Sequence, residues 1–197
     1  HTLAPDCATN RQRLTAGGSK VAFTEVSVNF DPPVLGADTL VVDGLFGSGL
    51  SKPLSGGFSS LVKYINQSDA PVVSIDLPSG LMSEDNTYSV RANIVRATLT
   101  LTFQQPKLAM LLADNQPYTG RLRVLDIGLA QAYADKTEAP CTLLDGADVR
   151  ALLRHRDTFA HKGDMGHALL IAGSYGMSGA AILAARACMR AGVGKLT

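Results

Sequence analysis

The sequence has no tryptophan, only three cysteines, and no apolar run that approaches the length of a membrane span. A transmembrane helix needs about 18 consecutive apolar residues, so we expect no membrane-spanning segment. Cys7, Cys141 and Cys188 lie far apart and form neither a C-x-x-C pair nor a zinc-ligand spacing. This cysteine usage is typical of a reduced chain and predicts a cytoplasmic protein.

The chain also lacks an excess of charge of either sign. It has 18 lysines and arginines against 17 aspartates and glutamates, for a formal net charge of +1. No basic stripe stands out, so we expect no nucleic-acid partner and no membrane partner. A hydrophobic fraction of 46% over 197 residues predicts a soluble globular protein, with room for one domain or one domain plus part of another.

The two ends of the sequence are unusual. The chain begins at His1 rather than at methionine, and residues 1–15 resemble a loop entering a helix rather than a signal peptide. Pro5 lies near the first turn of this expected helix, and Gly17–Gly18 would end it. The last residues look like a helix end followed by the start of a strand. We therefore expect both ends to be cut from a longer protein.

Short β-branched apolar runs alternate with helical patterns along the chain. The expected strands are 21–26, 39–45, 71–76, 97–103 and 122–128. Residues 56–70 carry apolar side chains at helical spacing, and 96–115 reads as a strand, a turn and a short helix. Nearly continuous apolar strands separated by helices predict an α/β fold with a parallel sheet covered on both faces.

Two of these strands end in an aspartate that precedes a glycine-containing loop. Asp43 is followed by 44–53 and Asp76 by 77–81. Parallel strands end at the same edge, about 4.8 Å apart if they are neighbours, so both carboxylates should face one crevice. Two acids there repel unless a positive group lies between them or one is protonated. A hard cation with Ser79 as a further oxygen ligand is one solution, and a turn or helix cap is the alternative for either acid alone.

The loop after Asp43 holds three glycines, Gly44, Gly47 and Gly49. Glycines allow backbone N–H groups to approach a phosphate, and a helix from about Gly56 would offer its positive end nearby. The pattern is neither a dinucleotide fingerprint, because Lys52 occupies the last glycine position, nor a P-loop. An unspecified anion or nucleotide pocket and a tight surface turn both remain open.

Two longer motifs carry a family resemblance. "VVDGLFGSGLSKPL" (41–54) followed by "VVSIDLPSGL" (72–81) resembles the paired signature of the NAD(P)H-hydrate epimerases, which have a Rossmann-like fold. The motifs at 99–112 and 124–129 resemble later strands of that domain. Residues 161–197 resemble the opening of a ribokinase-like NAD(P)H-hydrate dehydratase domain, which many bacteria fuse to the epimerase.

The resemblance implies a three-layer αβα epimerase domain at 1–140 with its N-terminal part missing, a linker at 141–160, and the first βα unit of the dehydratase domain at 161–197. It implies a bifunctional repair enzyme that interconverts the R and S forms of hydrated NADH or NADPH. In the full-length protein, the S form would be dehydrated at the expense of ADP or ATP. We also expect a homo-oligomer. The alternative is a non-catalytic nucleotide-binding or protein-interaction module on the same fold.

The resemblance also assigns residues. Asp43 and Ser79 would bind a potassium ion, and Asp76 would contact the substrate and carry out proton chemistry at the epimerised carbon. Lys107 could partner a phosphate or Asp76, or be solvated. In the dehydratase part, Gly179 and Ala180 are either substrate contacts or sites of close helix packing. The substrate loop would comprise Gly47, Ser48, Gly49, Leu50, Ser51, Lys52 and Pro53.

The family has a further glycine-rich loop with a potassium-binding asparagine, which this sequence lacks and which we expect before His1. The catalytic region of the dehydratase domain is expected beyond Thr197. Both active sites should therefore be incomplete in residues 1–197, and we expect no dehydratase activity from this segment.

Overall fold

A computed structural model describes residues 3–16, 20–26, 31–139, 141–153 and 155–197. The chain divides into two compact units, His1–Thr137 and Glu138–Thr197, which we describe separately. Among the described residues no helix is long and apolar enough to cross a membrane. The expected helix stop at Gly17–Gly18 lies outside the described residues.

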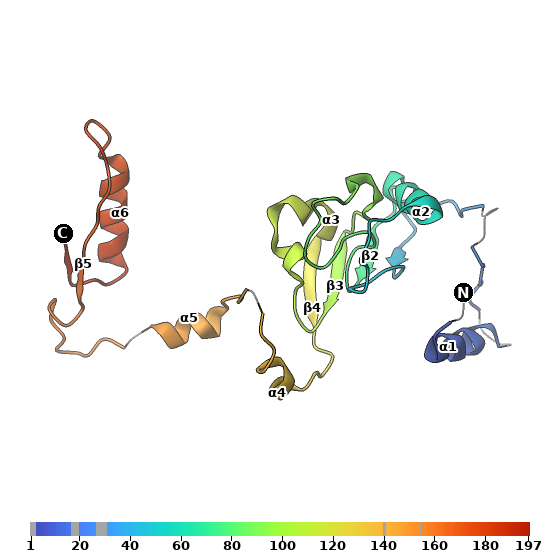
Figure 1. The fold of residues 1–197 in the computed structure, drawn as a ribbon, viewed down its shortest axis with the longest axis horizontal. Coiled ribbons are helices and arrows are strands. Elements are labelled where there is room, and N and C mark those ends of the chain that lie inside the picture. The colour runs from blue at the N-terminus through green and yellow to red at the C-terminus, as the bar shows by residue number, and fades with distance from the viewer. Residues whose placement is uncertain (1–2, 17–19, 27–30, 140, 154) are drawn as a thin grey trace. The chain divides into compact units, whose positions relative to one another are not determined.

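The first unit is built on a four-stranded parallel sheet (Figure 1). Its strands are β1 (Val41–Asp43), β2 (Val72–Ile75), β3 (Leu99–Phe103) and β4 (Arg121–Leu125), and the spatial order follows the sequence. The sheet with its crossover helix confirms the predicted α/β, Rossmann-like fold class.

Helix α2 (Gly56–Gln67) connects β1 to β2. Val62 and Ile65 form its buried face and pack with Val72 of β2, Leu54 and Val95 in one hydrophobic cluster. The later connections hold the 3₁₀ helices η1 (Arg91–Asn93), η2 (Leu108–Leu111) and η3 (Ala113–Asn115), and the short helix α3 (Gln116–Thr119). These segments and the loop after β2 form a second cluster: Leu77, Leu81, Ile94, Ala109, Met110 and Tyr118.

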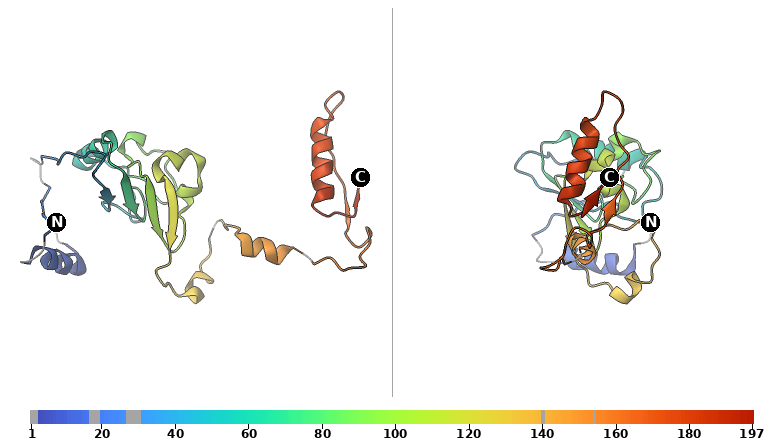
Figure 2. Two further views of the ribbon diagram at one scale, coloured as in Figure 1. Left: turned by 180° about the vertical axis from the view of Figure 1, so that it is seen from behind. Right: turned by 90° about the vertical axis from the view of Figure 1, so that its left-hand side faces the viewer.

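The two faces of the sheet differ. The face that packs against α2 and α3 carries buried polar side chains, and the Thr100 hydroxyl donates to the Thr119 carbonyl at 2.7 Å. On the opposite face Val42 is 63% exposed. The resemblance implies three layers, whereas the described residues show the sheet and the layer on one face (Figure 2).

The strand predicted at 21–26 is wrong. The structure gives no strand to these residues, and the side chains of Val21 and Phe23 are 57% and 46% exposed. A β-branched run forms a strand only where a neighbouring strand completes the hydrogen-bond ladder, and β1 lies at the edge of this sheet. The predicted first helix is confirmed as α1 (Pro5–Thr15), with proline in its first turn.

The second unit contains α5 (Gly146–Leu152), within the expected linker, and a parallel pair of two-residue strands, β5 (His167–Ala168) and β6 (Lys195–Leu196). Helix α6 (Gly179–Arg190) connects β5 to β6 and has no buried residue. The short helix α4 (Gln131–Ala134) belongs to the first unit. The domain boundaries predicted from the sequence stay predictions.

Candidate active site

The structure places both predicted acids at the carboxyl edge of the parallel sheet. Asp43 is the last residue of β1, and Asp76 follows the end of β2, where its N–H donates to the Leu101 carbonyl at 2.8 Å. The strands are adjacent, with Asp43 in register with Ser74. Both acids are buried, at 2% and 9% exposure. The expectation that they share one edge is therefore confirmed.

The carboxylate of Asp43 is held by hydroxyl and N–H groups. Its Oδ2 accepts from the Ser74 hydroxyl and the Ser79 N–H, both at 2.8 Å. Its Oδ1 accepts from the Ser79 hydroxyl at 2.6 Å and from the Leu45 N–H at 3.4 Å. The ion pairs found within the described ranges do not include Asp43. This carboxylate thus ties the end of β1 to the loop after β2.

The oxygens around Ser79 are of the kind that a hard cation prefers. The Ser79 hydroxyl lies beside Asp43 Oδ1 and 3.4 Å from the Phe46 carbonyl oxygen, so carboxylate, hydroxyl and carbonyl oxygens meet there. The described residues contain no group of three or more His, Cys, Asp or Glu side chains suited to a metal. An alkali cation does not need such a group, and the oxygens present fit one.

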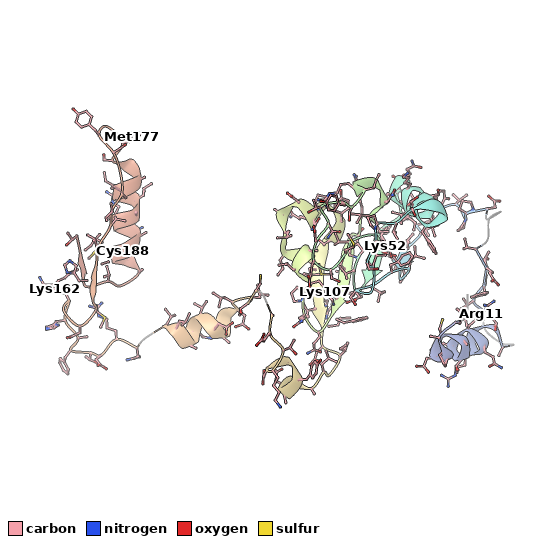
Figure 3. The ribbon with its side chains drawn as sticks, in the orientation of Figure 1. Arg11, Lys52, Lys107, Lys162, Met177 and Cys188 are labelled. Carbon is pink, nitrogen blue, oxygen red and sulfur yellow. The ribbon has the colours of Figure 1, made fainter. Side chains whose placement is uncertain are left out.

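Asp76 has a positive partner that is distant in the sequence. Lys107 Nζ lies 2.5 Å from Asp76 Oδ1, and the two side chains are 17% and 13% exposed. The same ammonium donates to the Thr102 hydroxyl at 3.0 Å and to the Phe103 carbonyl at 3.1 Å. Figure 3 labels Lys107 at the end of the sheet where β3 terminates. The sequence left three roles open for Lys107: binding a phosphate, pairing with Asp76, or lying in solvent. In the structure Lys107 pairs with Asp76.

These contacts set the protonation state of Asp76. Burial acts to raise its pKa, but the hydrogen bonds from Lys107 and from the Phe103 N–H, the charge of Lys107 and the Ser48 N–H together outweigh burial. The pKa of Asp76 therefore lies below its ordinary value, and the side chain is an ionised carboxylate near neutral pH. Lys107 supplies a positive charge to Asp76, whereas Asp43 is held by the Ser74 and Ser79 donors.

The start of the glycine loop lies against Asp76. The Ser48 N–H is 3.4 Å from Asp76 Oδ2, and a Cβ added to Gly47 would lie 3.4 Å from the same oxygen. The Phe46 ring packs edge-on against Phe58 of α2, with centroids 4.9 Å apart. Apolar side chains thus anchor the loop while its backbone faces the carboxylate.

The remaining predicted loop residues lie differently. Leu50 packs against the core cluster of α2, so its side chain anchors the loop. Gly49, Ser51, Lys52 and Pro53 are exposed, and Figure 3 labels Lys52. Ala180 is exposed on the first turn of α6 in the second unit. A Cβ added to Gly179 would meet no atom within 4 Å, whereas one added to Gly173 would lie 3.3 Å from the Ala181 Cβ, so the close approach to α6 is at Gly173.

Sequence reasoning missed Ser74 and Thr102. Both are completely buried, one on Asp43 and the other beside Lys107 and Asp76. The available signal was a polar residue at alternate positions of an otherwise apolar strand, in "VVSID" and "LTLTF". Such residues lie on the covered face of the sheet and need hydrogen-bond partners there.

The chain is similar in sequence to known NAD(P)H-hydrate repair enzymes. Bifunctional NAD(P)H-hydrate repair enzymes named Nnr from Coxiella burnetii and Moorella thermoacetica are 37% and 38% identical to the chain over 168 and 167 residues. Each match covers 85% of this chain, but only 34% and 31% of the relative. The bifunctional NAD(P)H-hydrate repair enzyme of Leishmania infantum is 34% identical over 180 residues, 88% of this chain and 32% of that protein.

The chain thus spans about a third of the length of the curated relatives it matches. The protein-family model described as YjeF-related protein N-terminus matches residues 1–109, which contain β1, β2, β3, Asp43, Asp76 and Lys107. This match covers more than half of the 197 residues. The chain therefore belongs to the YjeF-related protein N-terminus family.

Proposed function

We propose that the first unit carries an NAD(P)H-hydrate epimerase site, which interconverts the R and S forms of hydrated NADH and NADPH. The observation that carries this proposal is the buried Asp76 side chain at the carboxyl edge of the sheet, paired with Lys107 and facing the glycine loop. Open α/β sheets bind ligands at this edge. The names of the relatives support a role in nicotinamide nucleotide repair.

In this proposal Asp76 is the catalytic residue. A positioned carboxylate can accept and return a proton during the transition state, which typically accelerates a reaction by about 10²–10⁴-fold. The Oδ2 atom faces the loop at Gly47 and Ser48, where the nucleotide would lie. The loop from Gly47 to Pro53 would present backbone N–H groups to its phosphates.

We propose that a potassium ion binds beside this pocket, held by Asp43, Ser79 and the Phe46 carbonyl. The cluster of carboxylate, hydroxyl and carbonyl oxygens supports this assignment. The ion would supply positive charge that offsets the buried carboxylate and attracts the phosphates of the substrate. Asp43 itself would hold the ion and fix the loop after β2.

For the whole protein we propose a second activity, the ADP- or ATP-dependent dehydration of the S form to NADH or NADPH. The names of the relatives as bifunctional repair enzymes support this step. Ala180 at the start of α6 would contact substrate in that second site. A cytoplasmic location and a homo-oligomeric assembly stay predictions.

Thermal unfolding of the 197-residue chain tests substrate and cation binding. A ligand that binds only the folded state raises the melting temperature. We expect hydrated NADPH to raise it, and potassium chloride to raise it more than choline chloride at the same ionic strength. The potassium effect should vanish in Asp43→Asn and persist in the matched surface variant Asp69→Asn, whose side chain is exposed. No shift with hydrated NADPH in the parent chain would contradict a substrate site here.

A further inference from the structure

We propose that Lys107 is a positioning residue that gives the two oxygens of the Asp76 carboxylate different roles. Lys107 binds Oδ1 and leaves Oδ2 to face the substrate. This inference rests on the proposed epimerase function, and it assigns a role to a residue outside the glycine loop and the cation site.

The two oxygens of Asp76 have unequal surroundings. Oδ1 accepts from Lys107 Nζ at 2.5 Å, from the Phe103 N–H at 3.3 Å and from the Thr102 hydroxyl at 3.5 Å. Among the described residues, Oδ2 has one hydrogen-bond contact, from the Ser48 N–H at 3.4 Å. An oxygen with three donors is held in place and is a poor proton acceptor, whereas Oδ2 keeps lone pairs available. The geometry therefore selects Oδ2 as the reactive oxygen.

Lys107 has no hydrogen-bond donor left for a substrate. A lysine ammonium has three N–H groups, and those of Lys107 are directed to Asp76 Oδ1, the Thr102 hydroxyl and the Phe103 carbonyl. A phosphate contact would require breaking one of these bonds in a site that is largely buried. Lys107 therefore acts through Asp76 and does not bind the nucleotide directly.

The neighbouring acid on the sheet edge is Asp43, whose carboxylate is occupied by Ser74 and Ser79. Within the described ranges, Lys107 is the ion-pair partner of Asp76. Removing the lysine charge should therefore leave the buried Asp76 carboxylate without its ion-pair partner, and its pKa should rise.

Lys107→Met and Lys107→Arg test this role, with Lys63→Met as a matched control because Lys63 is exposed on α2. The first readout is an acid titration of the Asp76 carboxyl carbon by NMR in the 197-residue chain. We expect the pKa of Asp76 to rise in Lys107→Met, and to stay low in Lys107→Arg and Lys63→Met. The second readout is epimerisation by the whole protein. We expect kcat to fall on the order of tenfold or more in Lys107→Met, with a smaller change in KM.

A positioning role further predicts that Lys107→Arg recovers part of kcat, and that the acid limb of the pH–rate profile moves to higher pH in Lys107→Met. An unchanged Asp76 pKa in a folded Lys107→Met variant would overturn the inference. A rise in KM with unchanged kcat would also overturn it, since that result indicates direct substrate binding. A parent protein without epimerase activity would contradict the proposed function, while the NMR titration would still decide the role of Lys107.

Discussion

Two residues at the edge of the sheet that carries the candidate site have a strained backbone. Asp76 and Gln104, which follow β2 and β3, have positive φ angles of 66° and 62°. Side-chain-bearing residues in this region cost on the order of 1–3 kcal/mol each. The strain persists because the Asp76 N–H completes the ladder to Leu101 and its carboxylate pairs with Lys107. A strained, buried acid at a ligand-binding edge supports a functional role for Asp76.

We expect a side chain at Gly80, the residue after Ser79, to destabilise the folded chain strongly. The φ of Gly80 is 95°, and an added Cβ would overlap the Asn93 carbonyl oxygen. We expect Gly80→Ala to lower the free energy of unfolding by at least about 2 kcal/mol, because it adds both strain and a backbone clash. Urea unfolding measures this change. In the control, Gly57→Ala on α2, the new Cβ meets no atom within 4 Å, so stability should hold or rise. Equal stability of the two variants would contradict the turn geometry around Ser79.

The individual site residues differ in how far the sequence could predict them. Asp43 and Asp76 could be placed because each ends an apolar strand before a glycine-containing loop, and strand ends meet at one edge. The pairing of Lys107 with Asp76 could not be chosen over the alternatives, because 31 residues separate them and the turn after β3 decides where the lysine points. The potassium site stays a prediction.

At the scale of elements, periodicity predicted α2 and the four strands of the sheet. Helix α2 and strands β1, β2 and β3 have a buried face, and burial leaves a pattern of period 3.6 or 2 in the sequence. Strand β4 has no buried residue and was predicted from its apolar residues Leu122, Val124 and Leu125. The predicted strand at 21–26 failed because strand formation depends on a partner, which a single segment does not reveal. Strand β5 is shorter than its apolar run from 167 to 173 suggests, since it pairs only with the two residues of β6.

Helices α2 and α6 are each 12 residues long, yet they differ in burial. Helix α2 buries Val62 and Ile65, whereas α6 has no buried residue and its Leu183 is 68% exposed. Local opening is easier where few apolar contacts must be broken. We therefore expect amides of α6 to exchange with solvent faster than those of α2 in the 197-residue chain. Equal protection of both helices in a demonstrated monomer, measured by hydrogen–deuterium exchange, would contradict this difference.

At the scale of the whole molecule, the first unit contains the candidate site and all of the residues that the family model matches. The curated relatives are about three times as long as this chain, so the activity of the whole protein stays a proposal. In this chain the candidate site is an edge of a parallel sheet with two buried acids. Asp76 pairs with a lysine, and Asp43 accepts hydrogen bonds from serine hydroxyls. We propose that Asp76 performs epimerisation there.

Conversion of the R form of hydrated NADPH to the S form by Asp76→Asn in the whole protein tests this claim most directly. Asparagine keeps the shape of the side chain but cannot act as the proton acceptor, so the rate should fall on the order of a hundredfold or more while the protein stays folded. The surface control Asp69→Asn should retain the parent rate, since its side chain is exposed. Near-normal turnover by a folded Asp76→Asn variant would contradict the assignment of Asp76 as the catalytic residue.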